Sequence, residues 1–132
     1  PAPPLFGRDA KETAVVGMWQ HHCELEGFTA TQEAFRNSVE RLKGRAMTGE
    51  ADEEQIPELA ERGRRRVERF FAELDGRLAD NEFIAGDHIS IADITAFCAV
   101  EFAAWIKLGF TDEQANAKRW YDAISARPSA QA

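Results

Sequence analysis

The sequence predicts an all-α domain, a helical bundle built around a buried and nearly wholly apolar central helix that begins at Ser90. Three observations favour this fold. Apolar residues recur at helical spacing along most of the chain, and capping boxes mark several helix starts. No run of alternating apolar and polar residues is long enough for a strand. A chain of 132 residues fits one domain with one continuous core.

Composition narrows the class of protein. Hydrophobic residues make up 44% of the chain and charged residues 30%, values typical of globular proteins. The longest apolar stretch, Ile94 to Ile106, is too short to span a bilayer. The net charge of −7 repels polyanions, so we expect no nucleic acid and no membrane as partner. Without a secretory signal at the start, we expect a cytoplasmic protein whose Cys23 and Cys98 stay reduced.

The first helix begins at a variant of the capping box. In it the side chain of Asp9 accepts a hydrogen bond from a free backbone amide of the first turn, and the side chain of Glu12 reaches back toward the start of the helix. Apolar residues then recur at spacings near 3.6 and continue past Gly27 as far as Leu42. This pattern predicts one long helix with a kink near Gly27. From Gly44 to Ile56 the periodicity is lost among glycines and acidic residues, which predicts a loop.

A second helix begins near Pro57, a residue suited to the first helical turn. It carries an apolar stripe composed of Leu59, Gly63, Val67, Phe70, Phe71, Leu74 and Leu78. The same segment holds a basic cluster of Arg62, Arg64, Arg65, Arg66 and Arg69. Because Glu58 precedes Arg62 by four residues and Glu61 likewise precedes Arg65, the cluster favours a solvated helix face over a nucleic-acid site.

The central helix begins at a capping box, Ser90 with Asp93 in place of the usual Glu, across which Ile89 can contact Ile94. Both box residues are assigned a structural role, and loss of Asp93 is expected to cost on the order of 1 kcal/mol. The helix that follows is apolar on every side, as buried helices are, and Gly109 is predicted to end it.

The polar residues near the end of the chain predict a further helix and leave two candidate partners for the side chain of Glu101. Thr111 and Gln114 form a third capping box, and Pro128 stops the last helix. Glu101 lies within the central helix and needs a partner or an exposed edge, since burying an unpaired carboxylate is costly. Arg119 and Lys107 are the candidate partners.

The segment Phe83 to Asp93, FIAGDHISIAD, resembles the C-terminal domain motif of soluble glutathione transferases of the cytosolic, bacterial type. The start of the chain, PPLFGRD, resembles the interdomain linker of that family. The segments RWY and ARP near the end of the chain also resemble the family. The resemblance covers almost the whole chain. It implies an interdomain linker over residues 1–8, an all-helical transferase domain over 9–128 and a tail over 129–132.

The resemblance also implies a function. The whole enzyme would conjugate the sulfur of glutathione, its co-substrate, to electrophilic and mostly apolar compounds, as in detoxification. An upstream thioredoxin-like domain, absent from this chain, would bind glutathione and supply the catalytic Tyr, Ser or Cys. The chain alone is therefore expected to hold no cofactor, to contain no catalytic residue and to be inactive.

In this family the helical half forms part of the pocket for the hydrophobic co-substrate and part of a homodimer interface, mostly through its first helix. On that helix the resemblance makes Met18, His21, His22 and Leu25 the candidate pocket residues. Core packing is the alternative for Met18 and Leu25, and a surface position is the alternative for the histidines. The alternative function is a noncatalytic protein-interaction module, because similar helical domains occur in translation factors and synthetases.

Two further patterns on the first helix predict no site. The consecutive residues His21, His22 and Cys23 point about 100° apart on a helix, so they cannot converge on one metal ion. His22 and Glu26 share a face but lack a third ligand, and we expect no metal. Cys23 has Glu24 and Glu26 nearby, which oppose thiolate formation, so an inert thiol is predicted.

Overall fold

The structure is a computed structural model that describes residues 4–49 and 52–131. It contains helices α1 (Ala10–His22), α2 (Ala30–Ser38), α3 (Pro57–Leu78), α4 (Ile91–Ala104) and α5 (Ala115–Ser125). A π-helical segment, Cys23–Thr29, joins α1 to α2, and short 3₁₀ turns span Glu40–Leu42 and Pro128–Ala130. The described residues form isolated bridges but no named strand, and the all-α prediction is confirmed.

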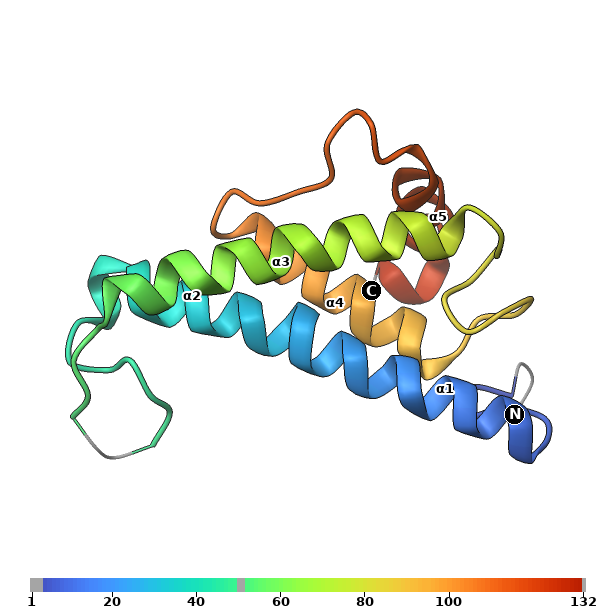
Figure 1. The fold of residues 1–132 in the computed structure, drawn as a ribbon, viewed down its shortest axis with the longest axis horizontal. Helices are drawn as coiled ribbons and strands as arrows, with labels where there is room; N and C mark the ends of the chain where they lie inside the picture. Colours follow the sequence, from blue (N-terminus) through green and yellow to red (C-terminus); the bar gives the residue numbers. More distant parts are fainter. Residues whose placement is uncertain (1–3, 50–51, 132) are drawn as a thin grey trace.

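The helices form a bundle with α4 at its centre. Figure 1 shows α1, the π segment and α2 as one long rod that runs beside α3, with α4 crossing behind them. The last helix, α5, packs against the C-terminal half of α3. Within the part of the chain that the structure describes, no helix has the length and apolar character needed to cross a membrane.

The first helical rod is continuous, as predicted, and Gly27 lies within its π segment. A Cβ atom at Gly27 would lie 2.7 Å from Cε1 of Phe70 and 3.1 Å from Cβ of Ala99, so only glycine allows this approach of three helices. A π-helical turn is one of the known causes of an irregular helix. The rod ends at Ser38, and Leu42 lies in a separate 3₁₀ turn, which corrects the predicted end.

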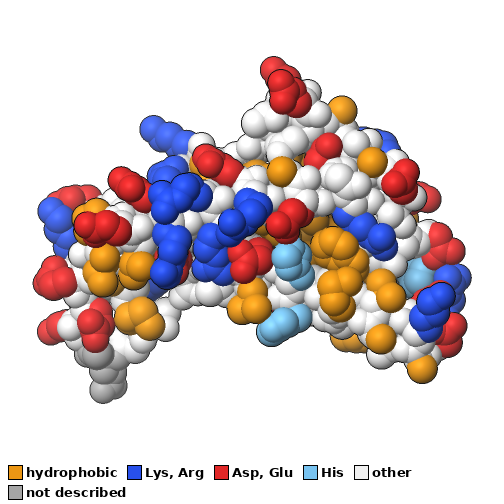
Figure 2. Space-filling model, in the orientation of Figure 1, with side chains coloured by type: hydrophobic (Ala, Val, Ile, Leu, Met, Phe, Trp, Pro, Cys, Tyr) orange, Lys and Arg blue, Asp and Glu red, His pale blue; other side chains and the backbone are white. Residues whose placement is uncertain are grey.

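The arginines of α3 tie this helix to its neighbours. Arg62 binds the carboxylate of Glu33 through two nitrogens, at 3.0 and 2.7 Å, in place of the predicted pair with Glu58. Arg66 binds Glu26 at 3.1 Å and the carbonyl of Leu25 at 2.9 Å. Paired, charge-assisted contacts of this kind fix geometry as well as adding attraction. Arg64 donates to the Ile106 carbonyl at 3.0 Å, so three of the five arginines of the cluster bind a neighbouring segment. Figure 2 shows Lys and Arg side chains interspersed with Asp and Glu side chains on this face of the molecule.

The start of α4 confirms the capping box and extends it. The Asp93 carboxylate is completely buried. Its Oδ2 accepts from the backbone N–H and the hydroxyl of Ser90, and its Oδ1 accepts from the backbone N–H of Ile84 and from Nε1 of Trp120, each at 2.9 Å. One side chain therefore joins the loop before α4, the first turn of α4 and the last helix, α5.

Burial is not uniform around α4. Its buried face consists mainly of small residues, which allow the neighbouring helices to approach closely. These residues are Ala92, Ala96, Ala99, Val100 and Ala103. The opposite face leaves Ile94, Cys98 and Trp105 exposed, with Trp105 at 68%. The helix is central as predicted, yet it carries one apolar face that the described chain does not cover.

The end of α4 differs from the prediction. Lys107, not Gly109, adopts the left-handed conformation, with φ +60°. Leu108 N–H donates to the Ala103 carbonyl at 3.1 Å and Lys107 N–H donates to the Ala104 carbonyl at 3.0 Å. These paired bonds form a Schellman motif, which ends the helix before Gly109 is reached.

The third capping box closes a turn rather than a helix. Thr111 N–H donates to Oε1 of Gln114 at 2.9 Å, but α5 begins only at Ala115.

The partner of Glu101 is Tyr121, whose hydroxyl donates to the Glu101 carboxylate. Arg119 instead donates to the Leu78 carbonyl at 2.8 Å.

The predicted linker docks on the start of α4, although its residues 1–3, like residue 132 of the tail, lie outside the described residues. Leu5 packs against the core, and its carbonyl accepts from Ile91 N–H, the first residue of α4, at 3.0 Å. Gly7 has φ +99° and donates to the Pro4 carbonyl at 3.0 Å. A glycine is required at this tight turn, since left-handed backbone is strained for other residues.

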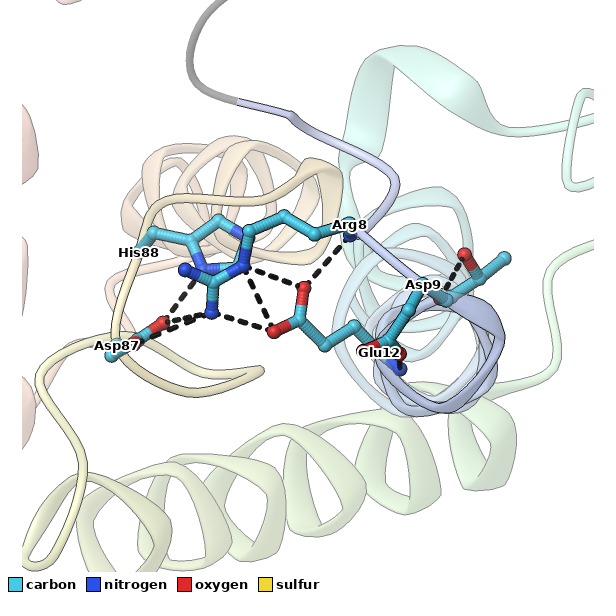
Figure 3. A network of polar contacts seen from close by, with 6 residues as sticks. Arg8, Asp9, Glu12, Asp87 and His88 are labelled. Carbon is cyan, nitrogen blue, oxygen red and sulfur yellow. Dashed lines mark hydrogen bonds and ion pairs between the residues drawn. The ribbon is translucent and has the colours of Figure 1, made fainter.

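An ion network holds the same junction (Figure 3). The Arg8 guanidinium binds Glu12 of α1 at 2.6 Å and Asp87 at 3.1 Å, and Asp87 lies 2.8 Å from Nδ1 of His88. The hydrogen bond from Arg8 lowers the pKa of Glu12, and those from His88 and Arg8 lower the pKa of Asp87. Asp9 caps α1 as predicted, by accepting from the backbone N–H of Glu12 at 2.9 Å, while the Glu12 carboxylate reaches back to the backbone N–H of Arg8 at 2.8 Å, one residue before the cap.

Replacing Asp93 with Ala should destabilise the fold by about 3–5 kcal/mol, because four buried donors would lose their acceptor. This loss exceeds the roughly 1 kcal/mol of a simple cap. Asp93→Asn keeps one acceptor oxygen and should cost less. Urea unfolding of both variants tests the effect. A loss of 1 kcal/mol or less in Asp93→Ala would show that the Ile84 and Trp120 bonds add nothing.

Gly63→Ala and Gly76→Ala in α3 form a matched pair with opposite expected signs. A Cβ at Gly63 would lie 2.7 Å from the Ala30 carbonyl oxygen and 2.7 Å from the Ala34 amide nitrogen, so α2 must shift at a cost of about 1–3 kcal/mol. A Cβ at Gly76 meets nothing within 4 Å, so alanine should stabilise the helix by about 0.5–1 kcal/mol. Thermal unfolding measures both, and a stabilised Gly63→Ala would contradict the close approach.

Candidate functional site

Two shallow depressions on the described surface are candidate sites, and the first lies between α1 and α3. It has a volume of about 520 Å³ and is lined by Met18, Trp19, His22, Glu73 and Arg77. Nε2 of His22 lies 2.7 Å from the Glu73 carboxylate. The Arg77 guanidinium lies 5.3 Å from the centre of the Trp19 ring, within cation–π range. The lining combines an apolar surface with a polar pair that spans the two helices.

The structure separates the four pocket residues suggested by the sequence. Met18 and His22 meet in this depression, and Met18 is 54% exposed. His21 points to the surface, 3.9 Å from the Glu24 carboxylate. Leu25 is exposed outside the depression. The core-packing alternative therefore fits neither Met18 nor Leu25.

The second depression lies where the π segment meets the C-terminal half of α4. It has a volume of about 460 Å³ and is lined by Phe28, Cys98, Glu101, Phe102 and Trp105. The Phe102 ring centre lies 5.4 Å from that of Phe28 and 5.7 Å from that of Trp105. Phe28 and Trp105 are exposed and Phe102 is half-buried. Aromatic groups gathered at one place on a surface are typical of ligand or partner sites.

Phe35 of α2 supports the second depression from the side. Its ring centre lies 5.2 Å from that of Phe102 and 6.0 Å from that of Trp105. These contacts hold the aromatic rings in place from both helices. The sequence pattern assigned Phe102 and Trp105 to the core, because it could not reveal which side of an all-apolar helix lacks a neighbour. That all-apolar pattern was nevertheless the signal that an apolar face exists.

Glu101 lies at the rim of the second depression and is exposed. It accepts from the hydroxyl of Tyr121, whose ring stacks on Phe97 with centres 5.4 Å apart. This hydrogen bond to Glu101 raises the pKa of Tyr121, so the phenol stays protonated at neutral pH. The carboxylate is thereby held in one orientation beside the aromatic rings.

The two cysteines differ in environment. Burial raises the pKa of Cys23 to about 12, which agrees with the predicted inert thiol. Cys98 is a free and exposed thiol in the lining of the second depression. Across residues 4–49 and 52–131, no group of three or more His, Cys, Asp or Glu side chains is arranged to hold a metal ion.

Comparison with known proteins gives consistent matches. Residues 43–128 match the family described as "Glutathione S-transferase, C-terminal domain". Glutathione S-transferase 2 of Saccharomyces cerevisiae is 29% identical over 127 residues, which are 96% of this chain and 52% of that protein. The chain thus spans about half the length of the curated relative that it matches.

Solved structures agree with this result. The crystal structure of Gtt2 from Saccharomyces cerevisiae matches with a TM-score of 0.87 and 28% identity, over 98% of this chain and 60% of that one. A glutathione S-transferase of class Gtt2 from Vibrio parahaemolyticus matches with a TM-score of 0.80 and 32% identity, over 98% and 57%. The chain belongs to the glutathione S-transferase C-terminal domain family.

Proposed function

We propose that the chain is the helical half of a glutathione transferase that conjugates glutathione to electrophilic compounds in the cytoplasm, as part of detoxification. A thioredoxin-like domain upstream of the linker would bind glutathione and supply the catalytic residue. The observation that carries the proposal is the family match by a chain about half as long as its curated relative, a transferase. The docking of Leu5 and Arg8 supports a linker role for residues 1–8.

The second depression is the proposed wall of the hydrophobic pocket. Phe28 and Trp105, both exposed, and the half-buried Phe102 offer an aromatic surface that an apolar compound could cover. Two helices hold the rings, so little side-chain freedom is lost on binding. This proposal moves the pocket from Met18, His21, His22 and Leu25 to the place where Phe28 of the π segment meets Phe102 and Trp105 at the end of α4.

The first depression is the proposed contact with a second copy of the chain. The family resemblance assigns dimer contacts mainly to the first helix, and Met18 and His22 of α1 lie here. Exposed Met18 would supply apolar area, while the pair of His22 and Glu73 would form a polar rim. A twofold interface uses the same patch on both subunits. These residues fit such a patch better than they fit an enclosed pocket.

A chimera tests the catalytic proposal. Residues 1–132, joined through the linker to the upstream half of the yeast relative, should conjugate glutathione to 1-chloro-2,4-dinitrobenzene, while residues 1–132 alone should not. In the chimera, Trp105→Ala should raise KM for the acceptor about fivefold and leave KM for glutathione unchanged, since one aromatic contact contributes about 1 kcal/mol. Conjugation by residues 1–132 alone would contradict the proposal. A folded, glutathione-binding but inactive chimera would favour the interaction-module alternative.

Met18→Glu tests the proposed dimer contact. The wild-type chain should sediment as a dimer, and a carboxylate at the interface should shift it to monomer in analytical ultracentrifugation, because two buried like charges would face each other. Leu25→Glu, also exposed but outside the depression, is the matched control and should remain dimeric. A Met18→Glu dimer with weakened binding of hydrophobic compounds would instead favour the pocket role suggested by the sequence.

A further inference from the structure

The second depression combines aromatic rings with one negative charge. Of the residues that line it, Glu101 is the charged one, and the others are Phe28, Cys98, Phe102 and Trp105. Oε1 of Glu101 accepts from the hydroxyl of Tyr121, and Oε2 makes no hydrogen bond to a described residue. A carboxylate oxygen therefore stays free to meet a ligand beside three aromatic rings.

Two other features make this place favourable for a positive charge. Phe102 lies in the last turn of α4 and Trp105 directly follows this helix, near the negative end of the helix dipole, where the Arg64 guanidinium, which does not line the depression, donates to the Ile106 carbonyl at 3.0 Å. Aromatic faces also attract cations, an effect of about 0.5–1 kcal/mol at exposed sites. Lysine and arginine side chains are absent from the lining, so no described lining residue neutralises Glu101.

We propose that this depression prefers planar aromatic compounds that carry a positive charge, with the rings of Phe28, Phe102 and Trp105 covering the aromatic body and Glu101 pairing with the cation. The inference rests on the proposed function, since it names the class of co-substrate that the pocket wall selects. Tyr121 acts as a positioning residue that holds the carboxylate at the rim. A neutral aromatic compound would use the rings alone, and an anionic one would be repelled.

Three probes of nearly the same shape test the preference: 1-naphthylmethylammonium, 1-naphthylmethanol and 1-naphthoate. Isothermal titration calorimetry of the chain at low salt should give a Kd for the cation about fivefold lower than for the alcohol, which corresponds to about 1 kcal/mol. The naphthoate should bind most weakly. Added salt should reduce the preference for the cation, because an exposed charge pair is screened.

Glu101→Gln is the decisive variant, and it should bring the ratio of the cation and alcohol Kd values close to one without changing alcohol binding. Glu68→Gln is the matched control: it removes an exposed acid of α3 that does not line the depression, so the wild-type ratio should persist. Trp105→Ala should weaken all three probes. A wild-type ratio in Glu101→Gln, or unchanged binding in Trp105→Ala, would overturn the proposal.

Failure of this inference is distinguishable from failure of the proposed function. Equal affinity of the wild-type chain for the cation and the alcohol would overturn the charge preference and leave the hydrophobic pocket wall intact. No heat of binding with any of the three probes would overturn both the preference and the pocket wall. Conjugation by the chimera would then still support the transferase assignment.

Discussion

The buried carboxylate of Asp93 is the interaction on which the rest of the bundle depends. A carboxylate without exposure to water is tolerated only when its oxygens are satisfied, and here they accept four hydrogen bonds. The donors come from the loop at Ile84, from Ser90 and from Trp120 of α5. The position of α4 is thereby set relative to the segment before it and to the last helix, and Ile91 is placed where the linker carbonyl of Leu5 accepts from it.

Close packing on the opposite side of the bundle follows from small residues. Alanines on the buried face of α4 and the glycines Gly27 and Gly63 let α2, the π segment, α3 and α4 approach one another closely. The large apolar residues of α4 cannot share that face. Phe102 and Trp105 therefore lie on the outer side, where they form the aromatic depression with Phe28. Small residues on one face of α4 thus give the tight core, and large residues on the other face give the aromatic depression.

Local signals in the sequence predicted most of the fold. Caps act over three or four residues, so Asp9, Pro57 and Ser90 marked the starts of α1, α3 and α4 correctly. Long-range contacts gave no such signal. Trp120 binds Asp93 from 27 positions away, and Arg62 prefers Glu33 over its neighbour four residues before it. The end of α4 was misjudged because Gly109 is the better left-handed residue, while the hydrogen bonds select Lys107.

The candidate site was harder to predict for the same reason. Helical spacing locates residues on a face, but only the packing of several helices determines which face is covered. The family resemblance named Met18, His21, His22 and Leu25, of which Met18 and His22 lie together, while the apolar pattern of the central helix assigned Phe102 and Trp105 to the interior. The partner of Glu101, Tyr121, lies on α5 and could not be chosen among the polar residues nearby in sequence.

The two ends of α4 are under different physical constraints. At its start, a change at Ser90 or Asp93 disturbs buried hydrogen bonds that join three segments, so these residues are tied to the fold. At its end, Glu101 and Trp105 are exposed, and substitutions at exposed positions usually change stability by less than about 0.5 kcal/mol. The end of α4 is thus free to change its chemistry while the start keeps the bundle intact. Under the proposed function, this division lets one scaffold serve different acceptor compounds, and it explains why the motif that identifies the family lies apart from the residues proposed to meet the ligand.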